Sequence, residues 1–506
     1  MQRAIGIIAG LLVFVAIALF PSDPVTFPFS AQLTAAVTGL MVVWWVTEAI
    51  PIYATALVPL VLFPILGILT PIDAAASYAD ETVFLIMGGF FIAAAMVRWN
   101  LHRRIALNVI NRAGSGTKKL VLGFMVATAF ISMWISNTVT AMMMIPIALA
   151  LVSTLMPVAI TDKNGEQIGK RQFASCVLLG VGYAATIGGM ATLIGTPVNA
   201  IFVAQLSSIF PEAPEIGFVE WMTFALPFAA LFLLIAWFWL TSVTNRNMPD
   251  VISGSKDVIG HNLKELGPLT LGEKWTLLVF LSVALAWIFR TPKEIGSLVI
   301  PGINTYFPGV SDATIAICGA LILFMLPVDA QKGIFTLDWE SAKEIPWGIL
   351  ILIGGGICLS EGIIQSGLAE LMTNFFMRFA NGPLVLIIFL IVLFITFLNE
   401  VLSNTATASI MIPLMGITSV SMGINPMMLM VPATLASSLG FMLPVGTPPN
   451  AIAFGTGYIS MKDMMRAGFA MDIIGCILIT LFMTFVIPTV LGITPELPAW
   501  AVIPGM

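Results

Sequence analysis

The stretch Ser136-Asn137-Thr138-Val139-Thr140 interrupts a long apolar run, and a near copy, Ser403-Asn404-Thr405-Ala406-Thr407, interrupts a second run. A second pair of motifs lies downstream, Gly195-Thr196-Pro197-Val198-Asn199 after the first and Gly446-Thr447-Pro448-Pro449-Asn450 after the second. Polar residues that break a helix are tolerated at membrane depth only where they are buried in protein or line a watered cavity. Two matched pairs of such breaks are typical of a binding site built by an internal repeat.

The composition places most of the chain in lipid. Of its 506 residues, 59% are hydrophobic and 9% are charged, whereas a soluble domain carries roughly 25% charged residues. The mean hydropathy is +1.03. The two histidines, His102 and His261, fall in polar connections and are predicted to be solvated. No nucleic-acid partner is expected.

The fold class predicted is an all-α polytopic membrane protein with eleven spans and two re-entrant hairpins, because a spanning helix needs about 20 apolar residues. The spans are expected at 4–20, 32–50, 52–70, 81–97, 172–209, 219–241, 274–290, 312–327, 346–364, 427–459 and 468–492, and the hairpins at 119–158 and 383–421. The fifth and tenth spans are expected to be broken at 195–199 and 446–450. The first segment begins like a signal peptide but has no small-residue cleavage site, which predicts a retained helix.

The same features recur in the same order in the two halves. Residues 32–241 are predicted to form one repeat and 274–492 the other, with an extra N-terminal helix in 1–31, a cytoplasmic linker at 242–273 and a C-terminal tail at 493–506. An odd number of spans in each copy makes the repeat inverted. With a cytoplasmic N-terminus and an outside C-terminus, three of the 21 lysines and arginines lie outside and the other eighteen inside. The positive-inside rule favours this topology in a bacterial inner membrane.

The four breaks are suited to hold an anion together with small cations. Each exposes the N-terminus of a helix, whose unpaired N–H groups and dipole bind anions. Ser, Thr and Asn oxygens and freed carbonyls can coordinate a hard cation. None of the motifs contains Lys, Arg or His. Because burying an uncompensated charge is costly, co-transported cations are predicted to neutralise the anion.

Through both pairs of motifs and the stretch Trp45-Val46-Thr47-Glu48-Ala49-Ile50-Pro51, the chain resembles the divalent anion/sodium symporters, which include INDY-type dicarboxylate, citrate and sulfate transporters. The resemblance covers the second to the eleventh span. It implies a homodimer with scaffold and transport domains, elevator-type alternating access and at least two co-transported Na+ ions. C4-dicarboxylates such as succinate are the expected substrates, with citrate and sulfate left open.

The resemblance also implies the ligands. One Na+ site would use Ser132, Ser136, Asn137 and the Gly195 carbonyl, and the other would use Asn399, Ser403, Asn404 and the carbonyls of Leu402 and Gly446. Substrate carboxylates would contact Asn137, Thr138 and Thr196 on one side and Asn404, Thr405, Thr447 and Pro448 on the other. The symmetry is imperfect, since Asn399 stands opposite Ser132.

Glu400 follows Asn399 inside the second hairpin, and intramembrane acids are functional candidates. A structural hydrogen-bonding role is favoured over proton coupling because its counterpart, Met133, is apolar. An anion exchanger using the same site without net sodium coupling stays open. A channel is disfavoured because the breaks are paired within one chain rather than around a subunit axis. An enzyme is not expected, because the breaks contain no His, Cys or carboxylate.

Overall fold

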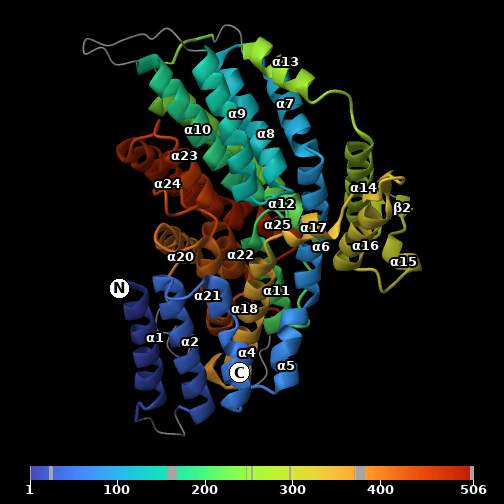
Figure 1. Cartoon of the computed structure of the whole chain (residues 1–506). Helices are drawn as coiled ribbons and strands as arrows, with labels where there is room; N and C mark the ends of the chain where they lie inside the picture. The colour runs from blue at the N-terminus through green and yellow to red at the C-terminus, as the bar shows by residue number, and fades with distance from the viewer. Residues whose placement is uncertain are drawn as a thin grey trace.

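The computed structural model describes residues 2–21, 27–155, 168–246, 248–251, 255–295, 298–369, 371 and 382–501. Nearly all of the secondary structure in these residues is helical (Figure 1). The helices of the first half are α1 (Gln2–Ala18), α2 (Phe29–Thr47), α3 (Ile52–Thr55), α4 (Val58–Ile65), α5 (Pro71–Ala76), α6 (Glu81–Arg98), α7 (Leu101–Ala113), α8 (Thr117–Ser132), α9 (Asn137–Leu155), α10 (Ile168–Gly189), α11 (Pro197–Ile209) and α12 (Phe218–Phe238). A π-helical turn, Trp239–Thr244, extends α12.

The second half begins after a linker that itself contains a helix, α13 (Ser255–Glu265). Its further helices are α14 (Leu271–Ile288), α15 (Ile303–Tyr306), α16 (Asp312–Met325), α17 (Trp339–Lys343), α18 (Trp347–Gln365), α20 (Leu384–Asn399), α21 (Asn404–Ser421), α22 (Met427–Ala436), α23 (Pro448–Gly455), α24 (Met461–Phe485) and α25 (Ile487–Leu491). Two short antiparallel β-ribbons lie in the connections between these helices. Between α14 and α15, β1 (Lys293–Ile295) pairs with β2 (Leu298–Ile300). Between α16 and α17, β3 (Pro327–Asp329) pairs with β4 (Ile334–Phe335).

Helix starts follow local capping chemistry. Thr270 and Glu273 form a capping box at the start of α14, and Asp80 accepts the Thr82 N–H at the start of α6. Both satisfy backbone donors that a helix leaves unpaired at its N-terminus. Pro197 and Pro448 open α11 and α23, where the missing N–H of proline costs nothing.

Within the described residues, seven helical segments are long and apolar enough to cross a membrane: Phe29–Thr47, Pro71–Arg98, Arg171–Gly189, Phe218–Thr244, Leu271–Ile288, Trp347–Gln365 and Met461–Phe485. The other expected spans correspond to shorter apolar helices, such as α1 and α16, or to two half-helices separated by a break. The protein is therefore a multi-helix membrane protein, while the expected set of eleven spans remains a prediction. Residues 368–379, which the sequence predicts as an amphipathic connector along the membrane surface, lie largely outside the described residues.

Within the expected span 52–70 the apolar helix is interrupted once and ends at Ile65. Its two parts are α3 and α4. Pro59 has no N–H to donate to the carbonyl four residues before it, which breaks the helix between the two parts. Gly67 then adopts a left-handed conformation with φ of 70° just beyond the end of α4.

The prediction for His102 is wrong. Its side chain is buried on the inner face of the amphipathic helix α7, and Nδ1 lies 2.8 Å from the Met96 carbonyl oxygen. Burial lowers the pKa of His102, which keeps the ring neutral. His261 lies on α13 with an exposed side chain, as predicted.

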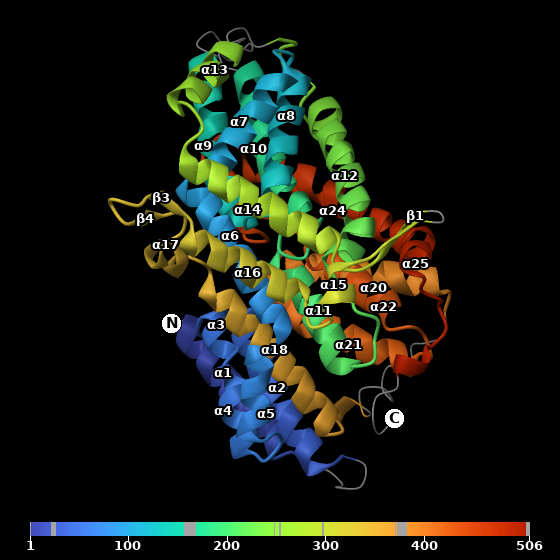
Figure 2. The same cartoon turned by 90° about the vertical axis from the view of Figure 1, so that its right-hand side faces the viewer.

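The helices around the four motifs pack in a crossed arrangement. In the first half, α9 and α10 lie together and both contact α23 of the second half (Figure 1). In the second half, α21 contacts α22 and also α11 of the first half. Helix α11 packs further against α18 (Figure 2). The two halves of the chain therefore interlock around the breaks instead of folding as separate units.

Candidate functional site

The first Ser-Asn-Thr motif joins α8 to α9. Helix α8 ends at Ser132 and α9 begins at Asn137. The Val139 N–H donates to Ser136 Oγ at 3.4 Å, so Ser136 caps α9. The Asn137 amide lies among three oxygens: with its nitrogen turned toward them it donates to Ser132 Oγ at 2.8 Å, to the Ala185 carbonyl at 3.1 Å and to the Gly195 carbonyl at 3.3 Å. Three of the four expected ligands, Ser132, Asn137 and the Gly195 carbonyl, thus lie together, while Ser136 caps α9.

The second Ser-Asn-Thr motif joins α20 to α21 in the same manner. Helix α20 ends at Asn399, α21 begins at Asn404, and the Ala406 N–H donates to Ser403 Oγ at 3.3 Å. The Asn399 amide nitrogen donates to Asn404 Oδ1 at 3.2 Å and to the Leu439 carbonyl. Asn399 is fully buried, yet its Oδ1 has no partner. A buried oxygen in this state is costly unless a ligand completes it.

The two Gly-Thr-Pro motifs end in asparagines that hold their own loops closed. Asn199 Nδ2 donates to the carbonyls of Gly189 (3.2 Å), Met190 (3.3 Å) and Thr192 (2.7 Å). Asn450 Nδ2 donates to the carbonyls of Gly440 (2.9 Å) and Leu443 (3.4 Å). Gly440 and Leu443 are the counterparts of Gly189 and Thr192, so the two loops share one hydrogen-bonding design. Sequence reasoning quoted both asparagines without giving them this role.

The threonines of these motifs begin the helices but do not cap them. Thr196 and Thr447 are the N-cap residues of α11 and α23, both in extended conformation, and neither side chain accepts a capping hydrogen bond. Both are buried, and Thr447 Oγ1 has no partner. Their hydroxyls are therefore free of the ordinary capping role.

The second loop is in contact with helix α10 of the first half. Tyr183 on α10 donates its hydroxyl to the Phe441 carbonyl at 3.2 Å, and the two rings meet edge to face. A Cβ built on Gly182 would lie 3.3 Å from Asn450 Oδ1. The predicted ligands of each half thus lie near one another within that half. The contact between α10 and the second loop joins the two halves. The structure shows no side-chain hydrogen bond for Thr138, Leu402 or Pro448. All of the substrate and Na+ assignments remain predictions.

Two acids support the second loop. Glu400 is almost fully buried and accepts the N–H groups of Met442 and Leu443, both at 2.8 Å. These bonds give Glu400 the structural role that was favoured from the sequence. Asp472 on α24 is also fully buried and accepts the Phe441 N–H at 3.2 Å. Sequence reasoning missed Asp472, although an acid inside an apolar segment is a recognisable signal.

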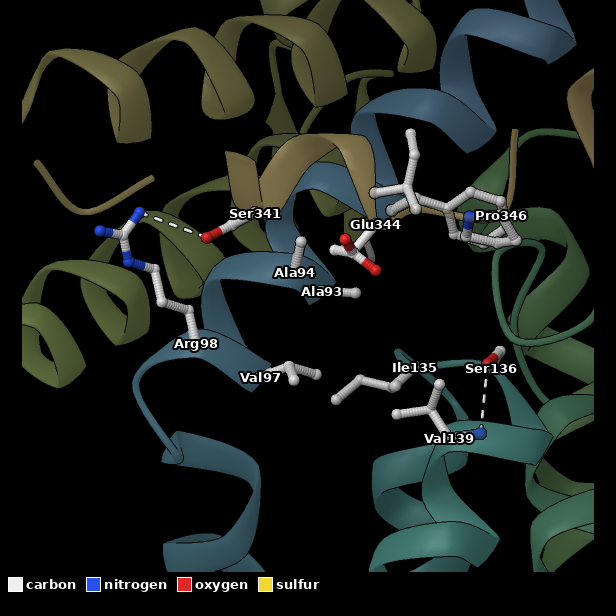
Figure 3. A pocket seen from close by; sticks show the side chains of 12 residues that line it. Ala93, Ala94, Val97, Arg98, Ile135, Ser136, Val139, Ser341, Glu344 and Pro346 are labelled. Carbon is white, nitrogen blue, oxygen red and sulfur yellow. Dashed lines mark hydrogen bonds between the residues drawn. The ribbon is translucent and has the colours of Figure 1, made fainter. Parts of the chain in front are cut away.

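A cavity of about 400 Å³ reaches the first Ser-Asn-Thr motif (Figure 3). Its walls are mostly apolar and come from α6, from the start of α9 and from residues 344–346. Arg98 stands at one end, where it pairs with Asp338 at 2.5 Å and donates to Ser341 Oγ at 3.3 Å. Ser136 stands at the other end. Glu344 also lines the cavity, so its mostly apolar walls carry two ionisable side chains, those of Arg98 and Glu344.

A family model described as the transmembrane region of sodium:sulfate symporters matches residues 1–492. The chain belongs to this family. Members are transporters and not enzymes, which confirms both the resemblance and the transporter class.

Among similar proteins are two that are named sodium-dependent dicarboxylate transporter SdcS. The one from Staphylococcus saprophyticus is 40% identical over 497 residues, covering 98% of this chain and 93% of the relative. The one from Staphylococcus aureus strain NCTC 8325 is 42% identical over 501 residues with the same coverage. This symporter family member therefore aligns with them over nearly its whole length.

Two solved transporters share the fold at low sequence identity. The YdaH transporter of Alcanivorax borkumensis superposes with a TM-score of 0.55 at 14% identity, covering 80% of this chain and 85% of that protein. MtrF of Neisseria gonorrhoeae superposes with a TM-score of 0.53 at 13% identity, covering 83% of each. These likenesses concern the fold alone.

Proposed function

We propose that this symporter family member carries C4-dicarboxylates such as succinate together with at least two Na+ ions. The observation that carries the proposal is the buried Asn399 Oδ1, which has no partner although its side chain lies at a helix break, beside Asn404. A small hard cation satisfies such an oxygen. The two relatives named sodium-dependent dicarboxylate transporters support the same reading.

The two Na+ sites would be built by the paired motifs. In the first, Ser132, Asn137 and the Gly195 carbonyl already converge, and turning the Asn137 amide oxygen inward completes a cation cage. In the second, Asn399, Asn404 and the carbonyls of Leu402 and Gly446 form the cage. Ser136 and Ser403 cap their helices through one lone pair, and the other lone pair of each oxygen remains for an ion.

The dicarboxylate would lie between the two halves. One carboxylate would meet Asn137, Thr138 and Thr196. The other would meet Asn404, Thr405, Thr447 and Pro448. The N-termini of α9, α11, α21 and α23 supply N–H groups and positive dipole ends. The motifs contain no Lys, Arg or His, so the neutralising charge must come from the co-transported Na+ ions.

The membrane arrangement that fits this site is an inverted repeat of five spans with one re-entrant hairpin in each copy, preceded by α1. The N-terminus would be cytoplasmic and the C-terminus outside. In this arrangement α8–α9 and α20–α21 are the hairpins, entering from opposite sides. Their tips meet the broken pairs α10–α11 and α22–α23 near the middle of the membrane.

Movement of the site as a rigid body is supported by an asymmetry between the halves. Helix α11 is largely buried and packs on α18, whereas several residues of its counterpart α23 are exposed and the cavity beside Ser136 separates α6 from α9. An elevator-like displacement would move both hairpins together against a dimeric scaffold. It would close the cavity between α6 and α9 and open an equivalent space on the other side of the membrane. Local opening of the loops would instead expose unsatisfied backbone groups to lipid.

The test is uptake of labelled succinate, citrate and sulfate by proteoliposomes containing the full chain. We expect succinate uptake to require an inward Na+ gradient and to continue without any anion inside the vesicle. Equal uptake in sodium and choline media at fixed pH would reject symport. Uptake that requires an internal counter-anion would instead establish the exchanger, which uses the same site.

A further inference from the structure

A buried hydrogen bond joins helix α11 to helix α18. Ser360 Oγ on α18 donates to Gln205 Oε1 on α11, and the two residues are 2% and 1% exposed. Gln205 Nε2 has no hydrogen-bond partner among the described residues. A Cβ built on Gly356, about one helical turn before Ser360, would lie 3.2 Å from this nitrogen, so the glycine leaves room for the amide. Helix α11 is therefore held against α18 at one buried polar point.

This hydrogen bond crosses the boundary between two groups of helices. Helix α11 packs against α21 and α22, which belong to the second hairpin and to the second broken pair. Helix α18 packs against α2, α3 and α4 (Figure 2). Under the proposed rigid-body displacement, the hairpins and broken helices move, while α18 and α2 to α4 remain with the scaffold. The bond between Gln205 and Ser360 must then break each time the site is displaced.

The counterpart of Gln205 in the second half is Thr456. The Gly-Thr-Pro motifs begin at Gly195 and Gly446, and Gln205 and Thr456 each come ten residues later. Thr456 follows the last residue of α23, and its Oγ1 donates to the Ala453 carbonyl of that helix at 2.7 Å. The hydroxyl donor of the second half is thus already used within its own helix.

The counterpart of Ser360 in the first half is an alanine. Helix α6 has a glycine pair at 88–89, and α18 has glycines at 354–356. Whichever two adjacent glycines of α18 are matched to the pair in α6, Ser360 falls opposite Ala94 or Ala93. Either alignment places a methyl group where α18 has a hydroxyl. Both alanines line the cavity that separates α6 from α9 (Figure 3).

The two end states of the proposed displacement therefore differ in one polar contact. In the present state α11 packs on α18, and the space between α6 and α9 is open. In an inverted repeat the opposite state exchanges these two arrangements, so that α23 would pack on α6. There the threonine at the end of α23 would meet a methyl group, and no equivalent of the bond between Gln205 and Ser360 could form.

We propose that the hydrogen bond between Gln205 and Ser360 is a latch that stabilises the present state, with the cavity beside Ser136 open, over the opposite state. The inference rests on the proposed function and makes its two end states unequal. The carrier rests with this cavity open, and each displacement of the site begins by breaking the latch. A net hydrogen bond changes such an equilibrium constant by about three- to tenfold.

Two single-cysteine reporters measure the populations of the two states. Cys318 is exposed and is first replaced by serine, while the other three cysteines are buried. Val97→Cys reports on the present state, because Val97 lines the open cavity. Ile363→Cys reports on the opposite state. Ile363 is 6% exposed here, lies three residues after Ser360 and therefore on the same face of α18, and matches Val97 when Ser360 is matched to Ala94.

Both reporters are labelled with a polar maleimide in lipid nanodiscs, where the reagent reaches both membrane faces, with sodium and succinate present. The ratio of the Ile363→Cys rate to the Val97→Cys rate follows the equilibrium between the two states. The decisive variant is Ser360→Ala, which removes the hydroxyl donor, and we expect it to raise this ratio about three- to tenfold. In a Gln205→Met background the same substitution should add nothing, because the partner is already absent.

The matched control is Ser207→Ala on α11. Its Oγ donates to the Ala204 carbonyl of the same helix at 3.1 Å, so no bond to α18 is lost and the ratio should match wild type. Should Ser360→Ala not give monodisperse protein, Gly356→Ala is measured under the same criterion, since its methyl group would displace the Gln205 amide.

A ratio for Ser360→Ala within about twofold of wild type would overturn the inference, because it would leave no free energy for the latch. Absence of Ile363→Cys labelling in a protein that takes up succinate would overturn it as well, since α11 would then never leave α18. Wild-type proteoliposomes without sodium-dependent succinate uptake would instead reject the proposed function. The uptake assay and the labelling ratio thus tell the two failures apart.

Discussion

Replacing Gly189 by alanine would push a methyl group into the Asn137 amide. A Cβ built on Gly189 lies 2.3 Å from Asn137 Oδ1, and real Cβ atoms essentially never approach a heavy atom within 3.0 Å. The amide must therefore move by about 0.7 Å or more, the difference between these two distances. It now lies 2.8, 3.1 and 3.3 Å from three oxygens. Such a shift would move the amide oxygen away from the place it takes in the proposed ion cage, and losing one contact to a charged group costs about 1.5–3 kcal/mol.

The expected loss of about 2 kcal/mol corresponds to about a 30-fold weaker first Na+ site. It is measured as the half-saturating sodium concentration for succinate uptake in proteoliposomes, alongside the sodium-dependent rise in melting temperature. The control is Gly180→Ala on the same helix, because its Cβ would first meet the flexible Met125 side chain. A Gly189→Ala protein whose sodium dependence stayed within twofold of wild type would refute the assignment of Asn137.

Three further predictions concern substrate, motion and pH. Thr138→Ala and Thr405→Ala should each weaken substrate binding by about 1.5–3 kcal/mol, the value of a hydrogen bond to a charged group. The half-saturating sodium concentration should change less. An unchanged half-saturating succinate concentration in both variants would contradict the substrate contacts. Cysteines at Ala94 and Val139, which line the same cavity, should when cross-linked stop succinate uptake but leave sodium-dependent stabilisation, and continued turnover at the wild-type rate would rule out rigid-body motion. Burial lowers the pKa of His102 below the ordinary 6.5. The stability that the neutral ring contributes is therefore present above pH 6.5 and is lost as the pH falls through the lower pKa of the folded protein. The decrease in melting temperature on acidification should be smaller in His102→Gln, and an identical decrease in the two proteins would contradict this prediction.

The membrane environment explains how much could be predicted from the sequence. Backbone groups in lipid must be satisfied within helices, so polar and Gly-Pro interruptions of apolar runs are readable in a single chain. Helices α9 and α21 begin within the Ser-Asn-Thr motifs, and α11 and α23 begin at the prolines of the Gly-Thr-Pro motifs. The family and the transporter class were predicted from these motifs and are confirmed.

Features that depend on tertiary contacts were not predicted. His102 looks polar in sequence, yet folding places it against the end of α6. The contact between Asp472 and Phe441 joins α24 to the loop between α22 and α23, and no local pattern specifies such a pairing.

At equivalent places the two Gly-Thr-Pro loops are bound by different side chains, Trp221 at the Met190 carbonyl and Asp472 at the Phe441 N–H, and neither side chain can be replaced by the other alone. A lone exchange of Trp221 for an acid would bring a carboxylate to the Met190 carbonyl, two acceptors facing each other without a proton donor. A lone exchange of Asp472 for tryptophan would leave the Phe441 N–H facing another donor. Each intermediate would bury unpaired polar groups at a cost of about 1–3 kcal/mol or more. Under the proposed inverted repeat, the side chain and the loop backbone that it binds would therefore have had to change together.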